Sequence, residues 1–235
     1  MDAIPIIFEN DQFVVINKPA GVGVHQENEQ IGIVTMLQHQ LSVPQLWLVH
    51  RLDKVTSGLL ILAKTSQVAA QLGERFALRQ IQKYYLALSD KKPKKKQGSV
   101  IGDMRKIRDG KWALSQSKEN PAATQFFSCG TDVPGLRFFI IKPHTGKTHQ
   151  IRVMLKSLGS PILGDNLYTG TDSDRTYLHA YQLKFELASK QFEFSCRPVA
   201  GKHFLGIEKQ STVVAEYFEP ECLRWPSINL PSQTR

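Results

Sequence analysis

Residues 50–63 read His50-Arg51-Leu52-Asp53-Lys54-Val55-Thr56-Ser57-Gly58-Leu59-Leu60-Ile61-Leu62-Ala63. The second half is a short apolar run, which is typical of a buried β-strand and far below the roughly 18 apolar residues of a membrane span. The first half contains a carboxylate, two cations and two hydroxyls in a predicted turn just before that strand. Catalytic and binding residues often lie on such loops at the ends of strands. Taken alone, the residues favour an ordinary surface turn in which Asp53 bonds to the backbone and Arg51 is its partner.

Strand-forming residues recur on both sides of this segment. Phe13-Val14-Val15-Ile16 predicts an early strand that Pro19 and Gly21 end in a turn. After Ala63, Thr65 or Ser66 is suited to cap a helix over residues 67–79, where apolar residues recur at helical spacing. Aromatic and branched residues predict further strands at residues 84–88, 123–128, 136–141 and 192–196. The expected fold class is α+β, with a mixed or antiparallel sheet.

A short amphipathic helix is predicted between Thr148 and Gly159. Its apolar residues, from Ile151 to Leu158, recur at i, i+3, i+4 and i+7, and Gly159 is placed to end it. The same spacing puts three basic side chains together on another face: His149, Arg152 and Lys156. That face fits either a site that offers cations or an ordinary solvated surface.

Charge and composition narrow the class of partner. The 235 residues carry 30 Lys and Arg against 21 Asp and Glu, a formal net charge of +9, which points to nucleic acid or an anionic membrane. The amino-terminal residues do not read as a secretory signal. Three widely separated cysteines disfavour a disulfide framework, so we expect a cytoplasmic protein. Residues 91–96, with five lysines, are either a loop that touches RNA or the tip of a hairpin.

Several common site patterns fail at particular positions. Gly146-Lys147-Thr148 resembles the end of a phosphate-binding loop, but Ile141 stands where that loop needs its first glycine. Gly21-Val22-Gly23 opens like a dinucleotide fingerprint, but its third glycine position is Gln26. His50 and Asp53 have no second histidine pair or carboxylate cluster near them in sequence to complete a metal site. We therefore expect no cofactor and no metal.

The string from His50 to Leu60 resembles the signature H-R-L-D-x-x-T-S-G-L of the RluA-type pseudouridine synthases, in which the aspartate is the catalytic residue. Other motifs of that family match in the family's order. They lie at residues 15–21 with His25, 83–87 (K-x-Y-x-A), 121–124 (A-x-T), 145–153 (G-[RK]-[ST]-H-Q-[IL]-R-V), 161–165 and 178–180. A chance match on one loop would not reproduce that order. The resemblance covers about residues 6–198.

The resemblance implies a pseudouridine synthase fold, with a central, mixed, largely antiparallel sheet flanked by helices and an active-site cleft across it. It implies a single catalytic domain over residues 1–235, acting as a monomer, with no accessory RNA-binding domain ahead of the first motif. Two departures stand out: Met154 occupies a position that is often histidine in the family, and the tail at residues 199–235 matches no family motif.

The implied activity is isomerisation of specific uridines in structured RNA, either transfer RNA or large-subunit ribosomal RNA. Asp53 would be the catalytic carboxylate on a flipped-out uridine, attacking the base, attacking the anomeric carbon or removing a sugar proton. By resemblance, Arg152 would keep Asp53 ionised, Tyr85 would stack on the uracil, and Arg51 would bind phosphate or fill the gap left by the displaced base.

Two other classes of function remain as alternatives. A noncatalytic RNA-binding protein of the same fold would share the charge and shape, although intact Asp53, Tyr85 and Arg152 argue against it. A nucleotide hydrolase that uses residues 146–148 would require triphosphate turnover and magnesium.

Overall fold

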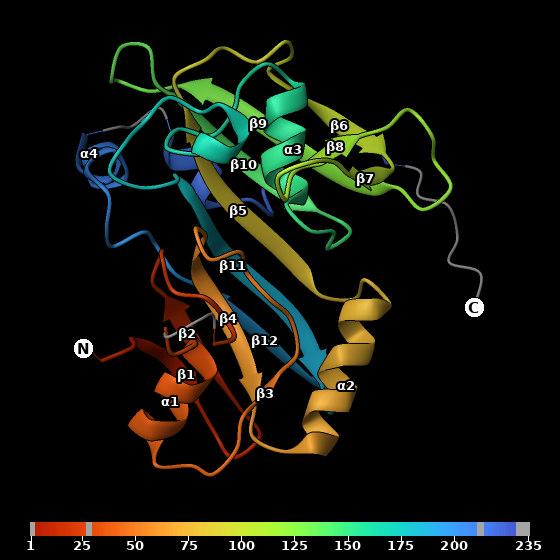
Figure 1. Ribbon diagram of the computed structural model, residues 1–235, viewed down its shortest axis with the longest axis vertical. Coiled ribbons are helices and arrows are strands. Elements are labelled where there is room, and N and C mark those ends of the chain that lie inside the picture. Colours follow the sequence, from red (N-terminus) through yellow and green to blue (C-terminus); the bar gives the residue numbers. More distant parts are fainter. Residues whose placement is uncertain (1–2, 27–29, 211–213, 229–235) are drawn as a thin grey trace. The chain divides into compact units, whose positions relative to one another are not determined.

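The computed structural model describes residues 3–26, 30–210 and 214–228. The chain forms two compact units, shown in Figure 1. Unit 1 comprises residues 1–85 and 178–201, and unit 2 comprises residues 86–177 and 202–235. The strand β5 (Gln82–Ser89) contributes residues to both units. That residues 1–235 form a single domain stays a prediction, and each unit is described by itself.

Unit 1 is a mixed sheet with two helices. Its elements are β1 (Ile6–Glu9), β2 (Phe13–Lys18), α1 (Ile33–Leu41), β3 (Trp47–Leu48), β4 (Ser57–Ala63), α2 (Ser66–Ala77), β11 (Leu178–Leu187) and β12 (Lys190–Ser195). Antiparallel pairs join β1 to β2, β2 to β4, β3 to β4 and β11 to β12, whereas β11 runs parallel to β4. This arrangement confirms the predicted α+β class with mixed, largely antiparallel strands.

The strand β4 is the centre of unit 1, and all seven of its residues are buried. Leu59 and Ile61 point into a cluster with Val68 and Leu72 of α2, whereas Leu60 and Leu62 point into a second cluster that includes Ile33 and Leu37 of α1. A strand covered on both faces reads as a continuous apolar run, because alternate side chains enter two different cores. The predicted buried strand is therefore confirmed.

The helix α2 begins where the sequence predicts. Thr65 is the residue before the first turn, and its hydroxyl accepts a hydrogen bond from the Val68 N–H at 3.2 Å, satisfying one of the donors that every helix start leaves free. The helix ends at Ala77, two residues before the predicted end. Arg79 has a left-handed backbone, with φ of 59°, which takes it out of the helix.

Unit 2 is built on three antiparallel strands in the order β10-β9-β6: β6 (Gln97–Gly102), β9 (Ala122–Gly130) and β10 (Arg137–Pro143). A separate two-stranded ribbon pairs β7 (Met104–Lys106) with β8 (Trp112–Leu114). The other elements are α3 (Gln150–Ser157), the 3-10 turns η1 (Asn166–Tyr168) and η2 (Ala215–Phe218), and α4 (Lys202–Gln210). The predicted helix ended by Gly159 is α3, and Gly159 has a φ of +75°.

The lysine run at residues 91–96 is not a hairpin tip, so that alternative is wrong. It connects β5 to β6, and β6 pairs with β9 instead of β5. Its backbone is fixed, because the Lys94 N–H bonds to the Leu158 carbonyl at 2.9 Å and the Lys96 carbonyl accepts from the Ser128 N–H at 2.6 Å. Pro93 is buried and all five lysines are exposed.

Within unit 2, the carboxyl-terminal tail contacts β9 and β10 through Trp225. The Trp225 ring lies 4.9 Å from Phe127 of β9, and the ammonium of Lys142 lies 5.7 Å from the same indole. Among the described residues, no helix combines the length and the apolar character needed to cross a membrane. All three cysteines are free thiols.

Candidate active site

The turn that carries Asp53 is closed by its backbone. The Thr56 N–H bonds to the Asp53 carbonyl at 2.9 Å, and the Gly21 N–H bonds to the Lys54 carbonyl at 2.8 Å. The second bond joins this turn to the loop after β2, whose motif lies some thirty residues earlier in the chain. The side chain of Asp53 is partly exposed, so the carboxylate is held at the surface of unit 1 by a fixed main chain.

Lys18 reinforces the same connection from inside the unit. Its side chain is fully buried, and its ammonium donates to the carbonyls of Pro19 at 2.8 Å and Val22 at 2.7 Å. It also lies 3.4 Å from the Lys54 carbonyl of the Asp53 turn. A buried ammonium requires acceptors, because leaving it unbonded would cost several kcal/mol. The Lys18 ammonium therefore fixes the conformation of the loop after β2, because carbonyls of that loop bind it.

The start of β4 approaches β11 unusually closely. Gly58 has a φ of +110°, and a Cβ at that position would lie 2.2 Å from the Ala180 carbonyl oxygen. Ser57 lies 2.8 Å from Nδ1 of His179, whose Nε2 is 2.7 Å from the Cys196 carbonyl. Because a carbonyl can only accept, Nε2 carries the proton and Nδ1 accepts from the Ser57 hydroxyl. These bonds fix the strand that follows the Asp53 turn.

The negative charge of Asp53 acts on the Tyr85 hydroxyl within unit 1. Burial, and next the negative charge of Asp53, raise the pKa of the Tyr85 hydroxyl above its ordinary value. The phenol therefore stays protonated at neutral pH, next to a region made negative by the carboxylate. The structure thus brings together two of the four predicted site residues. Arg51, on the same loop as Asp53, is exposed.

His50, the first residue of the signature, is a structural acceptor. Its Nε2 accepts from the Ile61 N–H of β4 at 3.0 Å, and its ring stacks on Phe76 of α2 at 4.5 Å. Burial, and next the charge of Lys83, lower the pKa of His50 to about 3. Burial likewise lowers the pKa of Lys83 to about 8. The imidazole is therefore neutral at neutral pH, a role that the sequence did not reveal.

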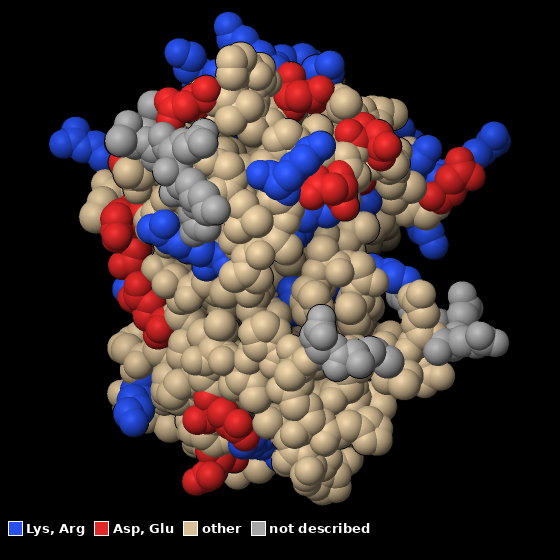
Figure 2. Space-filling model, turned by 90° about the vertical axis from the view of Figure 1, so that its left-hand side faces the viewer, with Lys and Arg blue, Asp and Glu red and all other residues tan. Residues whose placement is uncertain are grey.

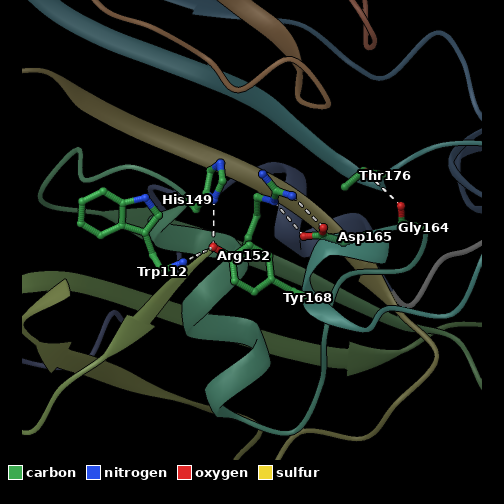
Figure 3. A network of polar contacts seen from close by, with 7 residues as sticks. All are labelled: Trp112, His149, Arg152, Gly164, Asp165, Tyr168 and Thr176. Carbon is green, nitrogen blue, oxygen red and sulfur yellow. Dashed lines mark hydrogen bonds and ion pairs between the residues drawn. The ribbon is translucent and has the colours of Figure 1, made fainter. Parts of the chain in front are cut away.

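Arg152, the fourth predicted site residue, lies in unit 2 on α3 and is bound to Asp165. Figure 3 shows the guanidinium facing the carboxylate, with Nε and Nη2 each 2.8 Å from one oxygen. Arg152 is 5% exposed and Asp165 1% exposed. Arg152 is thus buried, unlike the solvated basic face that its spacing with His149 and Lys156 allowed. The sequence placed Asp165 in a motif but assigned it no role.

An aromatic residue supports the guanidinium. The Arg152 guanidinium carbon lies 5.0 Å from the centre of the Tyr168 ring. The Tyr168 hydroxyl accepts from the Trp112 N–H at 2.9 Å and lies 2.8 Å from Nδ1 of His149 (Figure 3). The Tyr168 ring is therefore fixed by the hydrogen bonds of its hydroxyl, and its face in turn helps to fix the Arg152 guanidinium.

Two further positions shape the segment that presents Asp165. Gly164 has a φ of +75°, and a Cβ there would lie 1.8 Å from the Arg175 carbonyl oxygen, so only glycine fits. The Thr176 hydroxyl donates to the Gly164 carbonyl at 2.9 Å, as Figure 3 shows. Position 164 of the motif therefore requires glycine for steric reasons, and position 165 supplies the carboxylate that binds Arg152.

The loop before α3 is organised by the buried side chain of Gln150. Its oxygen accepts from the Thr145 hydroxyl at 2.7 Å and the Lys147 N–H at 2.9 Å. Its amide donates to the Ala123 carbonyl at 3.1 Å and the Thr124 hydroxyl at 2.9 Å, both on β9. The string that resembles a phosphate-binding loop is therefore tied down by its own side chains.

Asp53, Tyr85 and Arg51 belong to unit 1 and Arg152 belongs to unit 2. The predicted approach of Arg152 to Asp53, and the predicted cleft, stay predictions. Within the part of the chain that the structure describes, no group of three or more His, Cys, Asp or Glu side chains is arranged to hold a metal ion.

Comparison with known proteins gives consistent results. The family model described as RNA pseudouridylate synthase matches residues 12–157. An uncharacterised RNA pseudouridine synthase of Haemophilus influenzae is 52% identical over 204 residues, which cover 86% of this chain and 91% of that protein. The tRNA pseudouridine synthase C of Pasteurella multocida is 31% identical over 216 residues, covering 77% and 85%.

A third relative is longer than the region it shares with this chain. The ribosomal large subunit pseudouridine synthase D of Nitrosomonas europaea is 36% identical over 214 residues, covering 78% of this chain and 58% of that protein. Among solved structures, human RNA pseudouridylate synthase domain containing 1 superposes with a TM-score of 0.71 at 26% identity, covering 83% of each chain. Human RNA pseudouridylate synthase domain containing 4 superposes with a TM-score of 0.67 at 26% identity, covering 96% of this chain and 95% of that chain.

Proposed function

The chain belongs to the RNA pseudouridylate synthase family and is an RNA pseudouridine synthase, an isomerase; from that premise we propose that Asp53 is its catalytic carboxylate and acts on a uridine flipped out of structured RNA. The observation that carries the proposal is the Asp53 turn itself. A partly exposed carboxylate stands on a main chain fixed by two backbone hydrogen bonds, and its charge is felt by Tyr85.

The reaction balances without an outside reagent. The bond between N1 of uracil and the sugar breaks, the base turns over, a bond forms from C5 to the same sugar carbon, C5 loses a proton and N1 gains one. Asp53 can start this by attacking the base, by attacking the anomeric carbon or by removing a sugar proton. Each route needs the carboxylate ionised and close to the nucleotide, and none needs a redox cofactor or a nucleotide triphosphate.

Tyr85 is proposed to stack on the uracil as a neutral phenol. Since burial and the charge of Asp53 both raise the pKa of its hydroxyl, the phenolate form is disfavoured. The ring would then provide a flat surface for the turning base, and its hydroxyl a hydrogen bond. The hydroxyl would therefore meet the proton that leaves C5 as a neutral phenol and not as a preformed phenolate base.

Arg152 and Arg51 are proposed to bind the substrate in different ways. Arg152 is held by two bonds to Asp165 and by the Tyr168 ring, so it would offer its positive charge to Asp53 without having to reorganise. Arg51 is exposed beside Asp53 and free to bond phosphate or to occupy the gap left by the flipped nucleotide.

The proposed substrate is transfer RNA or large-subunit ribosomal RNA, in the cytoplasm, with the protein acting as a monomer and without a cofactor. Support comes from the names of relatives, which include both a tRNA synthase and large-subunit synthases. The charge of +9 agrees with a polyanionic substrate.

The test is pseudouridine mapping of total RNA from cells that lack this gene, complemented with wild-type protein or with Asp53→Asn. We expect a site that only the wild type restores, and a loss of turnover in vitro of at least about a thousandfold with RNA affinity nearly unchanged. Arg152→Ala should lower both turnover and affinity. Retained turnover in Asp53→Asn would overturn the assignment of Asp53.

A further inference from the structure

The ribbon formed by β7 and β8 is a tight hairpin in unit 2. Lys106 pairs with Trp112 and Arg105 with Ala113 across the two strands. The Lys111 N–H bonds to the Arg108 carbonyl at 3.2 Å, closing a turn over Asp109-Gly110, whose φ angles are 58° and 70°. Two consecutive positive φ angles at Asp-Gly are the signature of a turn that matches the twist of two antiparallel strands. We name residues 104–114 the basic hairpin.

The basic hairpin carries four cations and one acid. Arg105, Lys106 and Arg108 are exposed, and Lys111 is partly exposed; the acid is Asp109 at the turn. Among the residues that the structure describes, none of the four cations is paired with a carboxylate. Their charge is therefore available to a partner.

The hairpin is attached to the residues around Arg152. The main-chain N–H of Trp112, in β8, donates to the Tyr168 hydroxyl at 2.9 Å, and the Tyr168 ring lies under the Arg152 guanidinium at 5.0 Å. Figure 1 shows β8 beside α3, and Figure 3 shows Trp112 next to His149 in the same network. The position of the hairpin is therefore set by the same residues that set the position of the guanidinium.

Hydrogen bonds also fix the residue that precedes β7, at the open end of the hairpin. The Asp103 carboxylate accepts from the N–H groups of Glu119 at 3.0 Å and Asn120 at 2.9 Å. The side chain of Asn120 accepts from the Lys147 ammonium at 2.8 Å, which joins this end of the hairpin to the loop before α3. A cationic surface held in place in advance loses less conformational entropy on binding than a mobile one.

We propose that the basic hairpin is an RNA-contact surface that binds backbone phosphates next to the target uridine. The proposal rests on the proposed function, which puts the reacting nucleotide at Arg152. Arg105 and Lys106 lie on β7 and Arg108 lies at the turn, so the cations are spread along the hairpin and can meet more than one phosphate. Lys and Arg that neutralise phosphates contribute affinity by releasing counterions, whatever the base sequence.

The distribution of charge in the chain supports this surface. Unit 2 holds 20 Lys and Arg against 12 Asp and Glu, whereas unit 1 holds 10 against 9. An anionic membrane would also attract cations, but a membrane-binding surface needs an apolar face beside them. Near the tip of the hairpin, the large apolar side chain exposed to solvent is that of Ile107, at 39%.

The test compares two triple variants that remove the same charge from the same unit. The first is Arg105→Gln, Lys106→Gln and Arg108→Gln in the basic hairpin. The matched control is Lys118→Gln, Lys202→Gln and Arg224→Gln, at exposed positions of unit 2 outside the hairpin and outside the lysine run. Binding to total tRNA and to a large-subunit rRNA transcript is measured against salt, together with KM, kcat and the melting temperature of each protein.

We expect the hairpin variant to weaken RNA binding and raise KM by about tenfold or more. The slope of log affinity against log salt should become shallower by about 0.7 to 0.9 for each phosphate that the variant no longer neutralises. Melting temperature and kcat should change little, and the control variant should bind within about twofold of the wild type. Equal effects in both variants would mean that only total charge matters and would overturn the proposal, as would unchanged RNA binding by the hairpin variant.

Other outcomes separate this inference from the proposed function. A wild-type protein that binds RNA but makes no pseudouridine would contradict the proposed catalysis, while the binding comparison would still decide the role of the hairpin. Vesicles of phosphatidylserine and phosphatidylcholine provide a second partner. Loss of vesicle binding in the hairpin variant with unchanged RNA affinity would replace RNA by a membrane and overturn the proposal.

Discussion

The Arg152–Asp165 pair shows what one residue of a motif can contribute. Both side chains are almost fully buried and joined by two hydrogen bonds of 2.8 Å. A buried ion pair adds little stability compared with apolar residues, but removing one partner leaves the other charge without compensation. We therefore interpret the pair as a device that holds a cation in place for the reaction.

Asp165→Asn should destabilise the protein by about 3 kcal/mol, because the buried guanidinium loses its compensating charge. It should also reduce turnover, since Arg152 would no longer be held by two bonds. The measurement is urea unfolding together with the rate of pseudouridine formation. Asp132→Asn, at an exposed position, is the matched control and should leave both quantities unchanged. An Asp165→Asn protein as stable as the control would contradict the role of the pair.

His50 gives a second prediction at the scale of one residue, concerning acid. Burial lowers its pKa to about 3, so below about pH 6.5 the unfolded chain takes up a proton that the folded one does not. Folding stability should therefore fall as the pH drops through that window. The variant His50→Gln keeps an acceptor for the Ile61 N–H. Between pH 7 and pH 4 its free energy of unfolding should fall by about 2 kcal/mol less than that of the wild type.

The measurement is the free energy of unfolding of each protein at several pH values. His39→Gln is the control, because His39 is exposed on α1 and should leave the acid dependence as in the wild type. The same acid loss in His50→Gln as in the wild type would show that other titrating groups cause it.

At the scale of elements, β4 connects the Asp53 turn to the core. Its alternate side chains enter two cores, one with α1 and one with α2, and its first residues pair in parallel with β11. The parallel pairing brings His179 next to Ser57 although 122 residues separate them in sequence. The Asp53 turn is therefore positioned from three sides before any RNA binds.

Gly58→Ala should lower the free energy of unfolding by roughly 3 kcal/mol or more. The added methyl would lie 2.2 Å from the Ala180 carbonyl oxygen, at a φ of +110° that L-residues rarely adopt. Gly73→Ala in α2 is the matched control, because nothing lies within 4 Å of its added methyl and alanine favours helices by up to about 1 kcal/mol. Thermal unfolding should rank Gly58→Ala below the wild type and Gly73→Ala at or above it. The reverse order would contradict the close approach of β4 and β11.

At the scale of the whole molecule, charge is distributed unevenly over the chain. Most of the net charge belongs to unit 2, and Figure 2 shows Lys and Arg atoms gathered at the upper end of the view. Carboxylates are interspersed on the same face, so the surface is patchy. Such a surface steers a polyanion electrostatically and leaves sequence recognition to particular contacts.

RNA affinity should therefore fall steeply with salt, by at least about tenfold between roughly 50 and 200 mM. The reason is counterion release from phosphates that several Lys and Arg side chains neutralise. Filter binding or fluorescence anisotropy with a catalytically inactive Asp53→Asn protein would measure this without turnover. A flat response over that range would rule out phosphate contacts as the main source of affinity.

The sequence by itself determined the elements whose signals are local. The buried strand at β4, the capped start of α2 and the short helix α3 follow from hydrophobic period, a hydroxyl cap and a terminating glycine, all within about fifteen residues. The string from His50 to Leu60 also determined the family, because a reaction requires particular residues at fixed spacing. Several strands, among them β1, β6 and β11, and the helices α1 and α4 were not predicted, although β11 carries a local strand signal in the alternation of Leu183, Phe185 and Leu187 with charged residues.

Only the tertiary structure decided the partners of the charged and polar side chains. The bond from Arg152 to Asp165, the acceptor role of His50, the attachment of the basic hairpin through Tyr168 and the course of the lysine run join residues that local periodicity does not relate. The physical reason is that a pattern of apolar residues states which face is buried, but not which other element covers it. That choice depends on the packing of the whole chain, and it sets burial, pKa and hydrogen-bond partners together.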